Sequence, residues 1–212
     1  MRSIEDIVNF IEGNSLDVIK NIDYESVDVF DFLKDHFQKS DITHNYLFQF
    51  VYRSFYRLDN AGLTPEFKTE YFNILEQNRN LAEFDFEWIL KRLYKIPNWK
   101  GQHTFQFSFV TKMYNTINNK MPIYDSEVIK MFSLKRPEVS DFNKKLELYL
   151  NQFQLVQETY ELILDKNLLP SASALFDQKF SDHNLDQMKK LDFIFWSAGK
   201  INRKHEISGD NN

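Results

Sequence analysis

Residues 107–132 read FSFVTKMYNTINNKMPIYDSEVIKMF. Apolar side chains at the start of this stretch recur every three or four residues, which predicts an amphipathic helix over residues 103–117. A short loop, 119–124, follows and contains one proline. Asp125 then has the composition of a helix N-cap and opens a second helix that ends near Leu134. The stretch therefore predicts two helices joined by a short loop.

The same helical period extends over the rest of the chain. Only five Gly and five Pro interrupt 212 residues, and no alternating strand pattern of useful length occurs. The expected helices are 3–13, which opens with a capping box, then 30–37, 46–55, 65–75, 86–94, 103–117, 125–134 and 140–164, and two shorter helices that follow Pro170 and end by Trp196. We therefore predict an all-α protein, an orthogonal multi-helix bundle of roughly nine or ten helices.

Length and composition predict how this bundle is organised. With 42% hydrophobic and 16% aromatic residues, the chain can bury one sizeable core. We expect a single helical domain over residues 1–201, or two helical subdomains with a cleft between them, and a frayed tail over residues 202–212. The N-terminus does not resemble a leader and no long apolar run occurs, so we expect a cytoplasmic protein without a membrane partner.

Several kinds of chemistry have no support in the sequence. There is no cysteine, which excludes disulfides, thiolate zinc sites and iron–sulfur clusters. The five histidines lack HExxH spacing, and the motifs GxxxxGK[ST], GxGxxG and GxSxG are missing. We therefore expect neither a metal site nor a cofactor.

Charge is unevenly distributed along the chain. The formal net charge is −5, but residues 1–90 hold 8 Lys+Arg against 17 Asp+Glu, whereas residues 91–212 hold 18 against 14. The two segments therefore carry net charges of −9 and +4. One interpretation is a basic face that attracts a DNA duplex, and the alternative is an ordinary uneven surface.

Lys112 and Asp125 are the candidate catalytic residues of the opening stretch. Lys112 lies about 9 Å back from the end of its helix and the following loop reverses the chain, so both head groups can face one cleft. In base excision from DNA, a carboxylate stabilises the positive charge that develops on the sugar or activates a water, and a lysine can attack the sugar carbon. The structural alternatives are a helix cap for Asp125 and a surface lysine for Lys112.

The segment FSFVTKMYNTINNKMPIYDSEV, residues 107–128, resembles the central segment of the helix-hairpin-helix DNA glycosylases. It is more closely similar to the bacterial 8-oxoguanine DNA glycosylase-fold family, whose members carry an F-[AV]-[ST]-K stretch followed by P-[IV]-[YW]-D-S-x-V. The closing KLDFIFW, residues 190–196, resembles the end of that family. The resemblance covers about 35 of the 212 residues, and it implies that Lys112 occupies the nucleophile position and Asp125 that of the catalytic carboxylate.

Three features depart from the superfamily pattern. The hairpin normally carries a GxG whose amides hold a DNA phosphate, whereas no glycine occurs between Gly101 and Lys112 here. Asp125 is followed by Ser-Glu in place of the usual Thr-His or Val-His, and the interval between lysine and aspartate is shorter. These departures bear on how the hairpin holds DNA.

Aromatic and basic residues near the matched blocks are candidates for DNA contacts. Those that could stack on a flipped base are Trp99, Tyr114, Tyr124 and Trp196. Those that could contact phosphates are Arg92, Lys95 and Lys100, just upstream of the opening stretch. The alternatives are core packing for each aromatic residue and a solvated helix face for the basic cluster.

Two functions of different classes fit these observations. The first is a DNA glycosylase, with AP-lyase activity left open by Lys112, that flips a modified or damaged base out of double-stranded DNA and cleaves its N-glycosidic bond. Such an enzyme would serve repair or defence against phages with modified DNA, and we expect it to act as a monomer. The second is a non-catalytic α-helical module that binds nucleic acid or a protein partner, in keeping with the missing hairpin glycines and the acidic total charge.

Overall fold

The chain is built from helices. The computed structural model describes residues 1–81 and 83–209, without the side chains of residues 204–209, and over this part it contains eleven α-helices, one 3-10 helix and no strand. They are α1 (Ile4–Gly13), α2 (Ser15–Lys20), α3 (Tyr24–Lys39), α4 (Tyr46–Phe55), η1 (Leu58–Ala61), α5 (Pro65–Gln77), α6 (Phe86–Tyr94), α7 (Phe107–Ile117), α8 (Ser126–Met131), α9 (Phe142–Asp165), α10 (Pro170–Lys179) and α11 (Gln187–Gly209). The predicted all-α class is confirmed.

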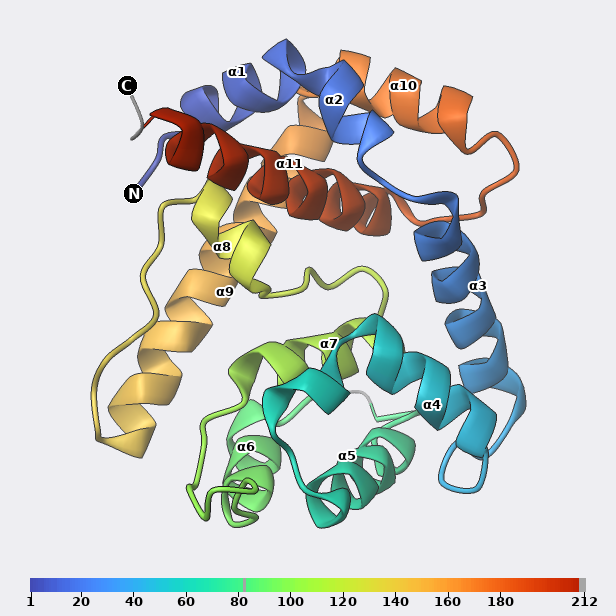
Figure 1. The fold of residues 1–212 in the computed structure, drawn as a ribbon, viewed down its shortest axis with the longest axis vertical. Helices are drawn as coiled ribbons and strands as arrows, with labels where there is room; N and C mark the ends of the chain where they lie inside the picture. Colours follow the sequence, from blue (N-terminus) through green and yellow to red (C-terminus); the bar gives the residue numbers. More distant parts are fainter. Residues whose placement is uncertain (82, 210–212) are drawn as a thin grey trace. The chain divides into compact units, whose positions relative to one another are not determined.

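The helices divide into two compact units, whose members can be followed by label in Figure 1. The first unit consists of residues 1–24 and the chain from residue 120 onward, with α1, α2 and α8 to α11. The second unit consists of residues 25–119, with α3 to α7 and η1. Of the two predicted arrangements, this division corresponds to two helical subdomains, and the cleft between them stays a prediction.

Local sequence sets where several helices begin. Ser3 accepts a 3.1 Å hydrogen bond from the backbone N–H of Asp6, as the capping box predicts. Asp141 caps α9 in the same way. Pro65 and Pro170 occupy the first turns of α5 and α10, where a missing N–H removes no intrahelical hydrogen bond.

Several helix bounds differ from the prediction, such as those of α3 and α7, and two elements differ most clearly. The helix α2 is short, and a six-residue helix carries too little hydrophobic period to be seen in the sequence. The helix α11 continues to Gly209, past the expected helix end at Trp196 and the expected boundary at residue 201. Gly199 lies within this helix and packs against α8, where a side chain would not fit. The helix thus extends past residue 201, and residues 210–212 lie outside the described residues.

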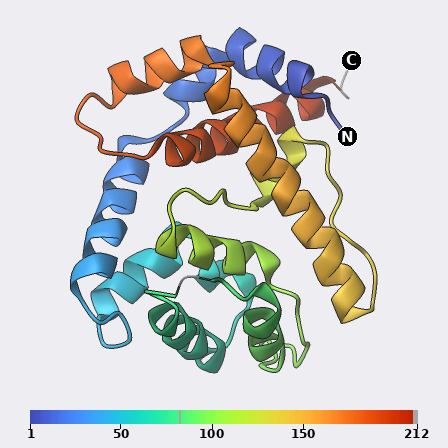
Figure 2. The same cartoon turned by 180° about the vertical axis from the view of Figure 1, so that it is seen from behind.

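The central helix of the first unit is α11. It packs closely against α8 and also contacts α2, α9 and α10 (Figures 1 and 2). The ring of Phe195 on α11 lies 4.6 Å from that of Tyr160 on α9 and 5.7 Å from that of Phe132, directly after α8. All three side chains are buried. Burial of these large rings stabilises α8 and α9 against α11.

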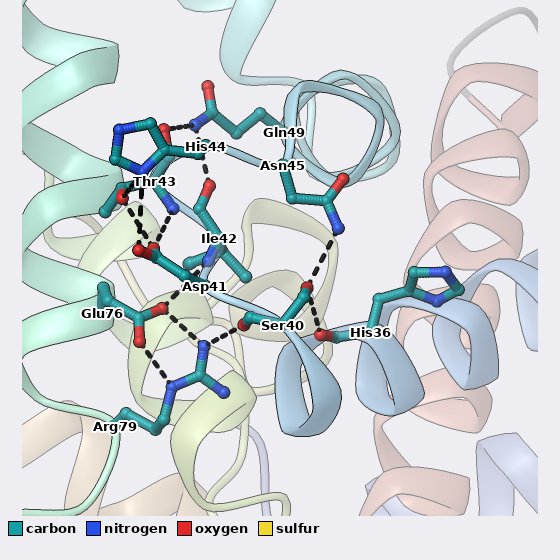
Figure 3. A network of polar contacts seen from close by, with 10 residues as sticks. All are labelled: His36, Ser40, Asp41, Ile42, Thr43, His44, Asn45, Gln49, Glu76 and Arg79. Atoms are coloured by element: carbon teal, nitrogen blue, oxygen red, sulfur yellow. Dashed lines mark hydrogen bonds and ion pairs between the residues drawn. The ribbon is translucent and has the colours of Figure 1, made fainter.

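A polar network stabilises the corner between α3, α4 and α5 in the second unit (Figure 3). Arg79 pairs with the Glu76 carboxylate, donates a 2.7 Å hydrogen bond to the carbonyl oxygen of Ser40, and stacks 4.1 Å from the ring centre of Phe37. Glu76 in turn accepts a 3.1 Å hydrogen bond from the backbone N–H of Ile42. These bonds hold the turn between α3 and α4 against the end of α5.

Candidate active site

Asp125 is the N-cap of α8, as the sequence predicts. Its Oδ1 accepts a 2.8 Å hydrogen bond from the backbone N–H of Glu127, and its side chain is half-buried. The Glu127 carboxylate accepts hydrogen bonds from Lys130 at 3.3 Å and from Arg203 of α11 at 3.2 Å. One capping bond does not exhaust the acceptor capacity of a carboxylate, so capping and a catalytic role for Asp125 are compatible.

A second carboxyl group, that of Asp192 on α11, contacts the loop that leads to Asp125. Its side chain is buried, with a relative exposure of 5%, and its Oδ1 accepts a 3.1 Å hydrogen bond from the backbone N–H of Ile123. Its Oδ2 lies 3.6 Å from Nζ of Lys189, one turn earlier on the same helix. Asp192 therefore ties the chain just before Asp125 to α11.

Burial changes the protonation of Asp192. It raises the pKa of this carboxyl to about 6, although the Lys189 ammonium and the Ile123 N–H both favour the ionised form. The negative charge of Asp125 adds to the increase. Because desolvation outweighs the ion pair with Lys189, Asp192 titrates close to neutral pH.

Tyr160 completes a group that we call the Asp125 cluster, composed of Asp125, Tyr160, Lys189 and Asp192. The Tyr160 hydroxyl is buried and has no hydrogen-bond partner in the described part of the chain. Burial, and then the charges of Asp192 and Asp125, raise the pKa of Tyr160 well above its usual value. The first unit thus gathers two carboxyl groups, an ammonium and a hydroxyl on α9, α11 and the start of α8.

Lys112 is buried in α7. Its relative exposure is 8%, and its Nζ donates a 3.4 Å hydrogen bond to the carbonyl oxygen of Tyr56. Nζ also lies 5.0 Å from the ring centre of Phe109 and 5.9 Å from that of Tyr56, within the range of cation–π attraction. The alternative of a surface lysine extended into solvent is therefore wrong.

Two tyrosines support the helix that carries Lys112. The hydroxyls of Tyr52 and Tyr71 lie 2.8 Å apart, and that of Tyr71 donates a 2.8 Å hydrogen bond to the carbonyl oxygen of Phe109. Tyr52 also lies 3.2 Å from Oγ1 of Thr116, farther along α7. These buried bonds position the backbone of α7 on both sides of Lys112.

The structure assigns the two candidate catalytic residues to different units. Asp125 belongs to the first unit with Asp192 and Tyr160, and Lys112 belongs to the second with Tyr56. Each is described within its own unit. The predicted convergence of the Lys112 and Asp125 head groups on one pocket stays a prediction.

The four aromatic candidates have different environments. Tyr124 is buried and its hydroxyl donates to Gln152, while burial raises its pKa. The ring of Tyr114 stacks 4.3 Å from that of Phe84, nearly parallel to it.

The two tryptophan candidates differ in exposure. Trp196 is half-buried, with Nζ of Lys200 3.3 Å from its ring centre. Trp99 is exposed at 69% of its surface. Of the four aromatic candidates, Trp99 is the one whose ring is most open to a partner.

The three residues predicted to contact phosphates also differ in their environments. Arg92 pairs with Glu70, donates to Gln77 at 3.3 Å and lies 4.9 Å from the ring centre of Trp88, so it is engaged within the second unit. Lys95 and Lys100 are exposed, and no ion pair joins either of them to a carboxylate in the described ranges. These two lysines are therefore better placed than Arg92 to meet a phosphate.

The basic and acidic halves of the sequence do not coincide with the structural units. The second unit, residues 25–119, holds 11 Lys+Arg against 12 Asp+Glu, because it combines acidic α3 with the basic residues that follow Glu87. The basic segment after residue 90 is thus divided between both units. Its predicted role as one basic face stays a prediction.

The sequence patterns do not identify three members of the Asp125 cluster as site residues: Tyr160, Lys189 and Asp192. The available signal was the placement of Lys189, Lys190 and Asp192 next to the apolar run Phe193–Trp196, because charges in such a run must be buried or must interrupt the helix face. Over residues 1–81 and 83–203, whose side chains the structure describes, no group of three or more His, Cys, Asp or Glu could hold a metal ion. Within the same ranges no helix combines the length and apolarity needed to cross a membrane.

Comparisons with known proteins return no relative. No family model matches the chain, and neither a curated protein nor a solved structure matches it significantly.

Proposed function

We propose that the protein is a DNA glycosylase that excises a modified or damaged base from double-stranded DNA, in repair or in defence against phages. The observation that carries the proposal is the pair of carboxyl groups in the Asp125 cluster: Asp125 is half-buried at a helix start, and Asp192 is buried with a pKa raised to about 6. Carboxyl groups in such different environments can take different roles in one reaction, here Asp125 at the sugar and Asp192 as the group that positions it. The glycosylase resemblance adds support, since its two blocks include both residues.

Asp125 would act on the sugar. As the bond between sugar and base breaks, the base leaves with the bonding electrons and positive charge develops on the sugar, which a nearby carboxylate stabilises. Water then adds to the sugar carbon and gives up a proton, for which Asp125 is the acceptor. Asp192 would keep Asp125 in position through its bond to Ile123. Lys112 would orient the substrate and would not attack the sugar carbon.

A second candidate function is a non-catalytic helical module that binds nucleic acid or a protein. It is favoured by the structural roles already evident for both candidate residues: Asp125 caps α8, and Lys112 bonds the carbonyl oxygen of Tyr56. Such roles explain both side chains without a reaction. The two functions differ in whether Asp125 must carry a charge.

An excision assay on a panel of duplexes with modified bases separates the two. Asp125→Asn retains a good N-cap but loses the charge, so we expect a folded protein without excision activity. Asp141→Asn is the matched control, because Asp141 is also an N-cap in the first unit and accepts a 2.7 Å hydrogen bond from the backbone N–H of Lys144. Wild-type excision rates in Asp125→Asn, or no excision of any base by the wild type, would defeat the glycosylase proposal.

A further inference from the structure

The turn at residues 98–102 is preorganised by the side chain of Asn98. Its Oδ1 accepts hydrogen bonds from the backbone N–H groups of Lys100, at 2.9 Å, and Gln102, at 3.0 Å. The backbone closes the same turn, with Gly101 donating to the carbonyl oxygen of Asn98 and Asn98 donating to that of Gln102, both at 2.9 Å. Gly101 has a φ of +72°, which favours glycine.

Contacts outside the turn anchor it to the second unit. The backbone N–H of Trp99 donates a 3.0 Å hydrogen bond to the carbonyl oxygen of Gly62, which follows η1. Nδ1 of His103 lies 2.8 Å from the carbonyl oxygen of Tyr94, at the end of α6. The backbone that carries Trp99 is therefore fixed to the end of η1 and to the end of α6.

This turn exposes aromatic and cationic side chains together. Trp99 is largely exposed, and Tyr94, Lys95, Lys100 and His103 are exposed around it in the sequence. The hydrogen bonds of the turn fix the backbone that carries the Trp99 indole, so the position of this exposed ring is set by the fold. Such an arrangement loses little conformational entropy on binding.

The sequence that contains the turn carries charge of one sign. Residues 88–124 contain five Lys and one Arg but no Asp or Glu, although acidic residues outnumber basic ones over the whole chain. Lys95 and Lys100 bracket Trp99 in this stretch and pair with no carboxylate in the part of the chain that the structure describes. The partner complementary to this surface is an anion with flat apolar groups.

We propose that the segment from Tyr94 to His103 binds single-stranded DNA, with Trp99 stacking on an unpaired base and with Lys95 and Lys100 contacting the flanking phosphates. A single strand fits better than a duplex, because an exposed ring can stack only on a base whose face is open. The interaction is independent of base identity, since every base has a π face. It goes beyond excision, because it requires neither a modified base nor a reaction.

The test is equilibrium binding to a labelled oligodeoxythymidine of about 12 nucleotides and to a duplex of the same length. We expect the wild type to prefer the single strand and Trp99→Ala to weaken this binding by about tenfold or more, with Trp99→Phe retaining most of it. Tyr46→Ala is the matched control: Tyr46 is 74% exposed on α4 of the same unit and should change binding less than about twofold. The Lys95→Gln/Lys100→Gln double variant should weaken binding and flatten its salt dependence.

The outcomes of this binding test are independent of those of the excision assay. Asp125→Asn should bind the single strand as the wild type does, so a protein that excises nothing can still support this proposal. Equal losses in Trp99→Ala and Tyr46→Ala, a preference for the duplex, or no binding by the wild type would overturn it. Thermal unfolding of each variant shows whether a loss reflects the fold, and Trp99→Phe keeps the stacking test valid if Trp99→Ala is unstable.

Discussion

Gly199 of α11 packs directly on the backbone of Glu127 in α8. A Cβ at Gly199 would lie 2.7 Å from the carbonyl carbon of Glu127, closer than side-chain carbons are found in proteins. The two nearest atoms, the carbonyl oxygen and carbon of Glu127, belong to the backbone, which cannot rotate away as a side chain can. Since α8 begins directly after Asp125 and α11 carries Asp192, this contact sets the spacing of the two helices that hold the carboxyl groups of the Asp125 cluster.

Gly199→Ala should therefore destabilise the protein by about 2 kcal/mol or more, because the new methyl group forces α8 and α11 apart. Gly13→Ala is the control: Gly13 ends α1, and a Cβ added there would meet no atom within 4 Å, so the change should be neutral or stabilising by up to about 1 kcal/mol. Urea unfolding of both variants measures the difference. Equal stability of the two variants would contradict the close packing of α8 on α11.

Asp192→Asn should change how stability depends on pH. The folded-state pKa of about 6 lies above the usual value of 3.8, so the folded protein holds this proton more tightly than the unfolded chain. The resulting stabilisation is fully present below about pH 4 and is lost as pH rises to about 6. The unfolding free energy of the wild type relative to Asp192→Asn should thus fall by about 2 kcal/mol between about pH 4 and pH 7.

Urea titrations at a series of pH values measure this difference. Asn can still accept the hydrogen bond from Ile123, so the comparison isolates the ionisation of Asp192. Asp141→Asn, at an exposed N-cap, is the control and should show a much smaller dependence between about pH 4 and pH 7. A difference between wild type and Asp192→Asn that stays constant with pH would show that this carboxyl is not perturbed.

Lys112 should not form a covalent adduct with DNA. Its Nζ is buried, donates to the carbonyl oxygen of Tyr56 and lies near two aromatic rings, whereas attack on a sugar carbon requires an amine that can reach the sugar. We expect borohydride reduction during turnover to trap no protein–DNA complex and the product to be an abasic site without strand cleavage. An adduct formed by the wild type and absent in Lys112→Gln would instead identify Lys112 as the nucleophile.

Arg79→Glu should unfold the corner between α3, α4 and α5. The change removes the hydrogen bond to Ser40 and places a second carboxylate beside Glu76, and breaking a largely buried pair in this way costs about 2 to 4 kcal/mol. Lys39→Glu, on the exposed surface of α3, should cost no more than about 0.5 kcal/mol. Chemical denaturation compares the two, and similar losses would show that the corner does not depend on Arg79.

Local patterns account for much of what could be predicted. The helix that carries Lys112, the loop after it and the N-cap at Asp125 all follow from residues close in sequence, because helical period and capping are local interactions. The same holds for the start of α5 at Pro65. The helix α2 was not predicted because it is too short to give a periodic signal, and the predicted helix end at Trp196 was wrong because α11 continues to Gly209.

The sequence by itself determined that this chain is all-helical, that it contains no cysteine, and that Lys112 and Asp125 occupy a helix–loop–helix stretch. Only the tertiary structure decided that Lys112 is buried against Tyr56 and that Asp192 joins Asp125 in one cluster. The bonds from Lys112 to Tyr56 and from Ile123 to Asp192 connect residues that are 56 and 69 positions apart in the chain, and they arise from the packing of whole helices. Burial sets the energy of a charged group, and it depends on neighbours that a local pattern does not contain.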